Sequence, residues 1–461
     1  MIPYAVDKKR LLTYGGYLLL LLVLVAILGY NCPHRPGAVI TGDPVHGYAP
    51  LIDSGEVTDW HCALFLHECI LLRDAIHTIS GCMFSGLDIL KLLWYPATLL
   101  IIGNFLYWAR KSTSAGKAYI AVPYLVSLML LLHFKGFIMF LCLDYFFIAL
   151  LLTSISLILA LHSNNRKWIL IILLVFVLLH LGQYRRNAAV LLPVLCMLAS
   201  VAMLPQKGKV KLLLCSLAAS VLIYFGGHWL TRTIFTTRST QPTVMMLTSD
   251  LLVAASLRGE SEEEKAEIYR TSGIEVQHKD PLFTAGVPVE WNLTYTEQQW
   301  SNFMQHYRHS WEQHTGSMLM ARALQLTQFF SYGHTSPAMV ETATVLYPAA
   351  MGKIKNTTNQ LRSIERFTCS VREIFYTIAI ALLVYAPFRK RKSSTSTAIM
   401  LLTLMAMLYL SSYILITPTG DDRYHAPAII LLCWAFSLAI AHLFSKSQSQ
   451  QKSPDYTCPQ R

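Results

Sequence analysis

The residues best suited to chemistry lie in the loop that follows the first long apolar run. Residues 33–61 read PHRPGAVITGDPVHGYAPLIDSGEVTDWH, so Asp43 stands in a Gly-Asp-Pro turn with His46 three residues on. A carboxylate held in such a turn can take a proton from a reacting hydroxyl. Asp beside Gly and Pro also simply shapes turns, and that alternative stays open. The candidate catalytic residues of this loop are Asp43, His46, Asp59 and His61.

A second group of candidates consists of cations at the ends of later apolar runs. They are Lys135 in HFKGF, Arg185 and Arg186 in QYRRN, and Arg423 with the adjoining Tyr424 in DDRYH. A guanidinium can bind a phosphate through two parallel hydrogen bonds. Arg423 could instead contact lipid headgroups or pair with Asp421 or Asp422. These side chains therefore predict a site for an anion, such as a phosphate attached to a lipid.

One acid, Asp144, stands inside an apolar run, FLCLDYFF. An ionisable side chain within a membrane span is costly and is by default functional. Two interpretations fit it equally: a structural bond to a partner such as Lys135 or a neighbouring helix, or a role in a site.

Composition places most of the chain in lipid. Hydrophobic residues make up 54% of the 461 residues and charged residues 14%, whereas a soluble domain carries about 25% charge. The net charge of +12 needs no nucleic-acid partner, because the cations gather in loops that anionic membrane lipids attract. Composition thus argues against a soluble enzyme and against a nucleic-acid-binding protein.

Lys and Arg concentrate in alternate loops between the apolar runs. The clusters are Lys8-Lys9-Arg10, Arg110-Lys111-Lys117, Arg166-Lys167, Lys207-Lys209-Lys211, Arg389-Lys390-Arg391-Lys392 and the tail with Lys446. Short loops rich in these residues stay in the cytoplasm. The loops between the clusters, including the acidic first one at about 31–87, are predicted to face outward. The candidate residues above all fall on that outer side.

A membrane-spanning helix needs roughly 20 mostly apolar residues. The candidate runs lie at about 11–30, 88–108, 118–133, 137–161, 168–184, 188–204, 211–229, 374–388, 395–415 and 425–444. About ten spans place both termini and every basic cluster in the cytoplasm. The sequence predicts an all-α, multi-pass membrane protein. Its first run is a retained anchor, since no small-x-small cleavage site follows it.

Two segments are more than connectors. Residues 61–82 have apolar side chains at helical spacing, interrupted by His67, Glu68, Arg73, Asp74 and His77. This pattern predicts an amphipathic helix on the outer surface. Residues 230–372 are polar and aromatic and are long enough for a mostly helical outer domain, with a helix beginning near GESEEEK.

The predicted organisation follows from these segments. It consists of an N-terminal transmembrane core (1–229) with a catalytic outer loop (31–87), an extracytoplasmic domain (230–372), C-terminal transmembrane helices (373–445) and a cytoplasmic tail (446–461).

The cysteines indicate no metal site, because the chain has no CxxC pair and no zinc-type Cys/His spacing. Cys32, Cys62, Cys69 and Cys82 share the first outer loop, where a disulfide and buried thiols fit equally. No cofactor is predicted. A divalent metal is compatible with one acidic pair, Asp43 and Asp59.

Taken together, these residues resemble the GT-C superfamily of integral-membrane glycosyltransferases, and in particular its bacterial members. The resemblance implies a location in the bacterial inner membrane. The likeness spreads along most of the chain: Pro36-Gly37, Asp43 and Trp60-His61 in the first loop, Lys135-Gly136, Arg185-Arg186-Asn187, the SEEEK run at 261–265, and Arg423, Tyr424 and Pro427 at the last span. The first-loop Asp is also similar to that of protein O-mannosyltransferases. Those enzymes have Asp-Glu where this chain has Asp43-Pro44, and the missing Glu argues against a metal site of that type.

This resemblance implies an inverting transfer of a sugar from a polyprenyl-phosphate-linked donor to a glycan, lipid or protein acceptor on the outer face. Asp43 would deprotonate the acceptor hydroxyl. Arg423, helped by Lys135 or Arg186, would neutralise the departing lipid phosphate. Physical chemistry agrees independently, since preorganised cations stabilise charge on a leaving phosphate. The chain also has no GxxxxGK[ST] run for nucleotide phosphates.

Two other functions remain as alternatives. A polysaccharide polymerase or ligase of the O-antigen type would use Arg185, Arg186 and Arg423 to hold a polyprenyl pyrophosphate, and Asp43 would be incidental. A transporter or lipid flippase fits less well, because paired repeats and helices broken by Gly or Pro are typical of transporters. This sequence has no visible repeat.

Overall fold

The computed structural model describes residues 8–30, 32–34, 44–58, 62–114, 143–163, 167–203, 209–234, 237, 240–241, 243–273, 276–277, 287–288, 294–330, 337–350, 377, 381, 394–416 and 425–450. These residues are mostly helical, which confirms the predicted fold class at that level. The strands β1 (Val276–Gln277) and β2 (Val287–Pro288) pair antiparallel, with Val276 opposite Pro288.

The helices and helical turns, in chain order, are α1 (Lys8–Tyr30), η1 (Pro44–Tyr48), α2 (Ala49–Ser54), α3 (Ala63–Ser80), α4 (Gly86–Ser114), α6 (Leu143–Ser163), α7 (Lys167–Tyr184), η3 (Arg186–Val190), α8 (Leu192–Met203), α9 (Lys209–Val221), η4 (Leu222–Gly226), α10 (Gly227–Ile234), α11 (Val244–Arg258), α12 (Glu262–Ser272), α13 (Glu297–Phe330), α14 (Pro337–Leu346), η5 (Pro348–Ala350), α17 (Ser394–Ile416) and α18 (Ala426–Gln450).

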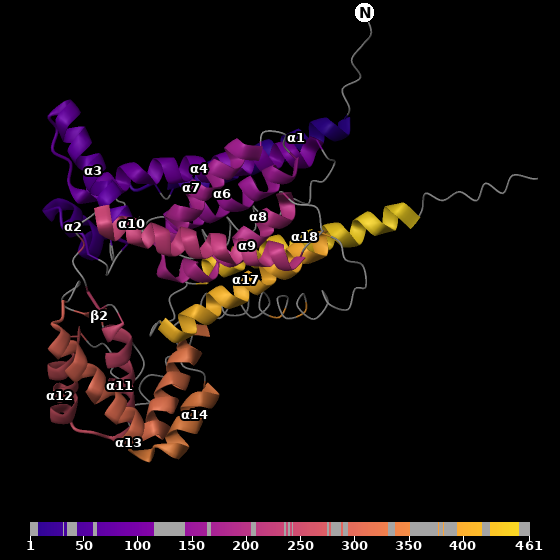
Figure 1. Ribbon diagram of the computed structural model, residues 1–461. Coiled ribbons are helices and arrows are strands. Elements are labelled where there is room, and N and C mark those ends of the chain that lie inside the picture. Colours follow the sequence, from indigo (N-terminus) through magenta and orange to yellow (C-terminus); the bar gives the residue numbers. More distant parts are fainter. Residues whose placement is uncertain are drawn as a thin grey trace, which may run out of the picture.

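Two separate hydrophobic cores organise these helices. The larger core joins α1 to α9 and η4 with α17 and α18, and α10 packs against α7. We call this group of helices the bundle. The smaller core joins α11 to α14, and we call it the α11–α14 unit. Figure 1 shows the long bundle helices side by side and the α11–α14 unit next to one end of them. A second core within the predicted domain at 230–372 means that this segment packs around its own apolar centre.

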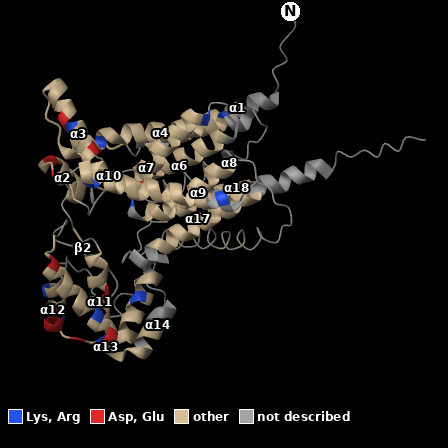
Figure 2. Ribbon diagram, viewed as in Figure 1, with Lys and Arg blue, Asp and Glu red and all other residues tan. Residues whose placement is uncertain are grey.

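Four described helices are long and apolar enough to cross a membrane: Gly86–Arg110, Leu143–Leu161, Lys167–Tyr184 and Leu214–Ile234. They indicate a membrane protein and coincide with four predicted spans. Shorter apolar helices at Tyr14–Ala26, Asn187–Val201, Ser396–Ser412 and Ala426–Phe436 coincide with four more. The span expected at 118–133 lies outside the described residues, as does 374–388 except for positions 377 and 381. In Figure 2 the bundle helices carry few charged residues between their ends.

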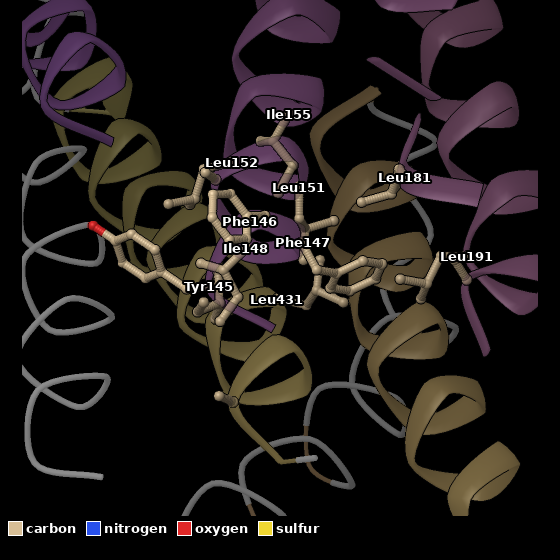
Figure 3. Packing of buried hydrophobic residues seen from close by; sticks show 14 of the residues in the cluster. Tyr145, Phe146, Phe147, Ile148, Leu151, Leu152, Ile155, Leu181, Leu191 and Leu431 are labelled. Carbon is tan, nitrogen blue, oxygen red and sulfur yellow. The ribbon is translucent and has the colours of Figure 1, made fainter. Parts of the chain in front are cut away.

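The helix α6 lies at the centre of the bundle. Within the most apolar stretch of α6, 78% is buried inside the protein. The corresponding share is 44% or less in the other three long apolar helices. Phe147 of α6 stacks on Tyr409 of α17 with ring centroids 6.1 Å apart. Figure 3 shows Leu431 of α18 close to the α6 side chains, and Leu181 and Leu191 beyond Phe147. Residues at the start of α6 are therefore surrounded by several other helices.

Three hydrogen-bonded pairs fix the direction of α4 relative to α6. They are Thr98–Tyr145 at 2.8 Å, Asn104–Thr153 at 2.9 Å and Trp108–Ser156 at 2.9 Å. Such bonds between membrane helices contribute about 0.6 kcal/mol each on average. Because the numbers rise together on both helices, α4 and α6 run in the same direction. Both begin at the end of the bundle where α3 lies and where α7 ends, and we call this the α3 end.

Candidate functional site

A buried ion pair lies at the α3 end. Asp144, in the first turn of α6, accepts a hydrogen bond at Oδ1 from Nη2 of Arg185, which follows α7. The Asp144 side chain is 1% exposed and that of Arg185 is 18% exposed. Removing one partner of a buried pair costs about 3–5 kcal/mol, because it leaves a charge uncompensated. Asp144 therefore fixes the Arg185 guanidinium at this end of the bundle.

A second polar cluster at the same end joins α3 to α7. Glu68 of α3 accepts hydrogen bonds from His180 Nε2 at 2.8 Å and from the Tyr184 hydroxyl. Nδ1 of His180 lies 2.8 Å from the carbonyl oxygen of Phe176. Both ring nitrogens of His180 thus face acceptors, and only the doubly protonated ring can donate to both. The result is a charged clamp between α3 and the last turn of α7.

Aromatic side chains connect these polar groups to the first loop. Phe65 of α3 contacts Tyr48 of η1, Phe146 of α6 and Tyr184 of α7, with ring centroids 6.0, 5.2 and 5.3 Å apart. Phe146 is two residues from Asp144, and Tyr184 precedes Arg185. The described residues that follow Asp43 along the chain therefore lie near both polar clusters.

The short helix α2 is fixed against the start of α4. Asp53 Oδ1 accepts a hydrogen bond of 2.6 Å from the backbone N–H of Gly86, an otherwise unpaired donor at a helix N-terminus. A Cβ at Gly86 would lie 2.4 Å from the carbonyl oxygen of Ala49, so only glycine permits this approach. Arg73 of α3 also donates to the carbonyl oxygen of Ile52. Together these contacts hold η1 and α2 at the α3 end.

The predicted site residues fall into two groups. Of those described, His46 is exposed in η1, Arg185 bonds to Asp144, and the backbone of Arg186 begins η3. The others lie outside the described residues: Asp43, Asp59, His61, Lys135, Arg423 and Tyr424.

The chain neighbours of the undescribed candidates still locate parts of the first loop and of the last connection. Pro44, next to Asp43, begins η1, and Cys62, next to His61, caps α3 and donates to the carbonyl oxygen of Gln183. His425, next to Tyr424, is fully buried just before α18. In Figure 3 Leu431, near the start of α18, lies beside residues at the start of α6.

The described residues contain no group of three or more His, Cys, Asp or Glu side chains that could hold a metal ion. The described cysteines of the first loop, Cys32, Cys62, Cys69 and Cys82, are joined by no disulfide. Cys69 is fully buried, where burial raises the pKa of its thiol well above the ordinary value.

The α11–α14 unit has a polar cluster of a different kind. Asp250 of α11 accepts hydrogen bonds of 2.8 Å at Oδ2 from the Tyr307 hydroxyl and from Arg322 Nη2, both on α13. Asp250 is fully buried, and burial raises its pKa to about 6. The carboxyl thereby joins α11 to α13 inside the unit.

The sequence interpretation missed the clamp formed by Glu68, His180 and Tyr184. A signal for it exists: on a helical wheel Glu68 falls among Leu72, Ala75 and Ile79, within the apolar arc of α3. A carboxylate on an apolar face needs a partner, and His180 within the apolar α7 is a matching one. The sequence leaves the partner of Asp144 open, and among the described residues the structure pairs it with Arg185.

No family model, curated protein or solved structure matches this chain.

Proposed function

We propose that the protein is a membrane glycosyltransferase that moves a sugar from a polyprenyl-phosphate-linked donor to an acceptor on the outer face of the membrane. Asp43 is the general base of this proposal. Arg185, Arg186, Lys135 and Arg423 with Tyr424 bind the lipid phosphate, and His46, Asp59 and His61 complete the loop side of the site.

The observation that carries the proposal is the position of Arg185. Its guanidinium lies at the end of a helix that is apolar enough to span a membrane, and a buried carboxylate holds it there. A preorganised cation at the edge of lipid is suited to charge that develops on a departing phosphate. The donor in this proposal lies in the membrane with its phosphate at the α3 end, within reach of Arg185.

The first loop supplies the second argument. The segment that directly follows Asp43 is fixed at the α3 end by Tyr48, Asp53 and Gly86. A general base must come within hydrogen-bond reach of the acceptor hydroxyl. The residues that follow Asp43 are fixed at the same end of the bundle as Arg185. This favours a single site that contains both the general base and the lipid phosphate.

The shared direction of α4 and α6 supports the predicted sidedness. One further span is predicted between them at 118–133, and with one intervening span two helices must run the same way, as α4 and α6 do. By the distribution of Lys and Arg, the α3 end is then the outer end. The multi-pass topology and the inner-membrane location belong to this proposal.

The test is sugar transfer by purified protein in liposomes that contain a panel of polyprenyl-phosphate-linked monosaccharides, with glycan, lipid and peptide acceptors supplied. The readout is release of polyprenyl phosphate. We expect Asp43→Asn to abolish release and Arg423→Gln to lower kcat. The matched control is Asp74→Asn, an exposed carboxylate of the same segment that bonds to its neighbour Arg73. Release by Asp43→Asn at the wild-type rate would contradict the assignment of Asp43 as the general base.

One observation favours a second candidate, a polymerase or ligase of long glycans. An open cavity of about 990 Å³ on α13 is lined by Trp300, Asn302, Gln305, Arg308 and Glu312, among others. An aromatic ring together with several hydrogen-bonding side chains suits a polar chain such as a glycan. In that function the outer arginines bind a polyprenyl pyrophosphate, and Asp43→Asn leaves activity intact.

A further inference from the structure

The helix α3 has two halves with opposite surroundings. In its first half Phe65, Leu66, Cys69 and Ile70 are buried against the bundle. From His77 onward every residue to Ser85 is exposed. Figure 1 shows α3 projecting away from the long bundle helices. The clamp at Glu68 therefore fixes one half, and the other half extends from the bundle.

The projecting half carries an exposed apolar stripe. Leu71, Ala75 and Ile79 are all exposed, and their spacing of four residues places them on one face of the helix. Leu71 is 57% exposed and Ile79 is 86% exposed. The opposite face carries His77, and Asp74 lies at the edge of the stripe; both are also exposed.

Two further large apolar side chains are exposed just beyond the helix. Gly81 ends α3 with φ of 71°. Met83 and Phe84 follow, 80% and 37% exposed. Soluble proteins rarely expose contiguous apolar patches of this kind unless the patch binds something.

The chain itself identifies what covers this patch. Gly86, two residues after Phe84, begins α4, which is long and apolar enough to cross a membrane. The helix α4 has its own exposed apolar face, with Leu92, Tyr95 and Leu99 at helical spacing. The exposed apolar surface of α3 therefore leads directly into one that faces lipid if α4 spans the membrane.

We propose that Leu71, Ile79, Met83 and Phe84 insert into the lipid at the membrane–water interface and make the second half of α3 a membrane anchor. An amphipathic helix with one apolar and one polar face binds at this depth, between headgroups and acyl chains. The face with His77 then points to water, and Asp74 lies at the level of the headgroups. The sequence pattern predicts that the helix lies on the surface. The structure restricts the inserted part to the half that the bundle leaves exposed.

This anchor gives α3 a mechanical role that does not depend on sugar transfer. Its first half is clamped to α7 through Glu68, His180 and Tyr184. Its second half follows the lipid surface. Arg73 of the same helix bonds to α2. The position of the membrane surface relative to the bundle is thereby coupled to the position of η1 and α2.

The test is photocrosslinking of the full chain in liposomes of phosphatidylethanolamine and phosphatidylglycerol. Benzoylphenylalanine is introduced singly at Ile79 or Met83, and lipid adducts are detected by the mass of the modified peptide. His77 is the matched control, two residues from Ile79 and on the other face of α3. Leu99, 67% exposed on α4, is the reference for a side chain in lipid.

We expect phospholipid adducts at Ile79, Met83 and Leu99, and only the background level of adducts at His77. Adducts at Leu99 without adducts at Ile79 and Met83 would overturn the anchor. Crosslinking of Ile79 or Met83 to a second copy of the chain would also overturn it and would indicate an interface between copies. Equal lipid adducts at His77 and Ile79 would contradict the proposed orientation of the helix.

Discussion

The guanidinium of Arg185 is hydrogen bonded to the carboxylate of Asp144, which joins the segment after α7 to the first turn of α6. Arg185→Gln leaves the Asp144 charge buried, and we expect a loss of about 3–5 kcal/mol in unfolding free energy. Asp144→Asn with Arg185→Gln should recover part of this loss, since the buried carboxylate charge is removed together with the guanidinium. Thermal unfolding in detergent measures both.

The control for this pair is Arg270→Gln. Arg270 bonds to Glu267 on the surface of α12 with its side chain 76% exposed, and surface pairs stabilise little. If Arg185→Gln unfolded at the same temperature as Arg270→Gln, Asp144 would not be holding the guanidinium in place.

The clamp between α3 and α7 gives a second prediction. Glu68→Gln removes the negative charge that faces His180 and Tyr184, and bonds to charged groups contribute about 1.5–3 kcal/mol. We expect faster hydrogen exchange throughout residues 63–80, because α3 loses its charged attachment to α7. Asp74→Asn, on the exposed face of the same helix, should leave the exchange of α3 unchanged. Unaltered protection of α3 in Glu68→Gln would show that the aromatic contacts of Phe65 suffice.

The contact of α2 with α4 depends on one glycine. Gly86→Ala places a methyl group 2.4 Å from the carbonyl oxygen of Ala49, and we expect a cost of about 1–3 kcal/mol, as for other overpacked sites. Gly103→Ala in the same helix has no atom within 4 Å of its new Cβ and is the matched control. Comparing the melting temperatures of the two variants checks the prediction. A melting temperature of Gly86→Ala at or above that of Gly103→Ala would contradict the observed approach.

Asp250 predicts a pH dependence of the α11–α14 unit. Its pKa is raised from 3.8 to about 6 by burial, so the folded unit binds this proton more tightly than the unfolded chain. The contribution of Asp250 to stability is therefore fully present below pH 3.8 and is lost as the pH rises through about 6. A shift of about two pKa units corresponds to roughly 3 kcal/mol.

Hydrogen exchange of α11 at pH 5 and pH 7, corrected for the intrinsic exchange rate, measures this dependence. We expect less protection at pH 7, and relative to the wild type Asp250→Asn should lose the part of this dependence that Asp250 causes. His306 on α13, whose pKa burial lowers, contributes in both proteins. Glu263→Gln, an exposed acid of α12, should retain the wild-type dependence. Greater protection at pH 7 than at pH 5 would show that the Arg322 charge outweighs burial.

The broad architecture follows from the sequence because long apolar runs carry their own signal. The helices α6, α7 and α18 coincide with predicted spans since a membrane helix satisfies its backbone bonds within one segment. The start of α12 is equally local, and its capping box between Ser261 and Glu264 confirms the helix start that the GESEEEK run predicts. Such features need no knowledge of what lies across the fold.

The pairings at the α3 end could not be predicted in the same way. Arg185 as a boundary cation fits lipid phosphate, a substrate phosphate or an acid equally well until the neighbouring helix is known. Asp144 stands 41 residues away in the chain, and its place beside Arg185 depends on how α6 and α7 pack. Glu68 lies 112 residues from His180. Contacts between residues so far apart in the chain depend on the tertiary packing of the helices.

The central claim is that this protein transfers a sugar from a lipid-linked donor. The most direct measurement follows a radiolabelled sugar on polyprenyl phosphate in liposomes that contain the purified wild-type protein, with a panel of glycan, lipid and peptide acceptors supplied. The proposal predicts that polyprenyl phosphate is released and that label appears on an acceptor in equal amount. Label that stays on the donor across the full panel of lipid-linked sugars, with protein that remains folded, would contradict it.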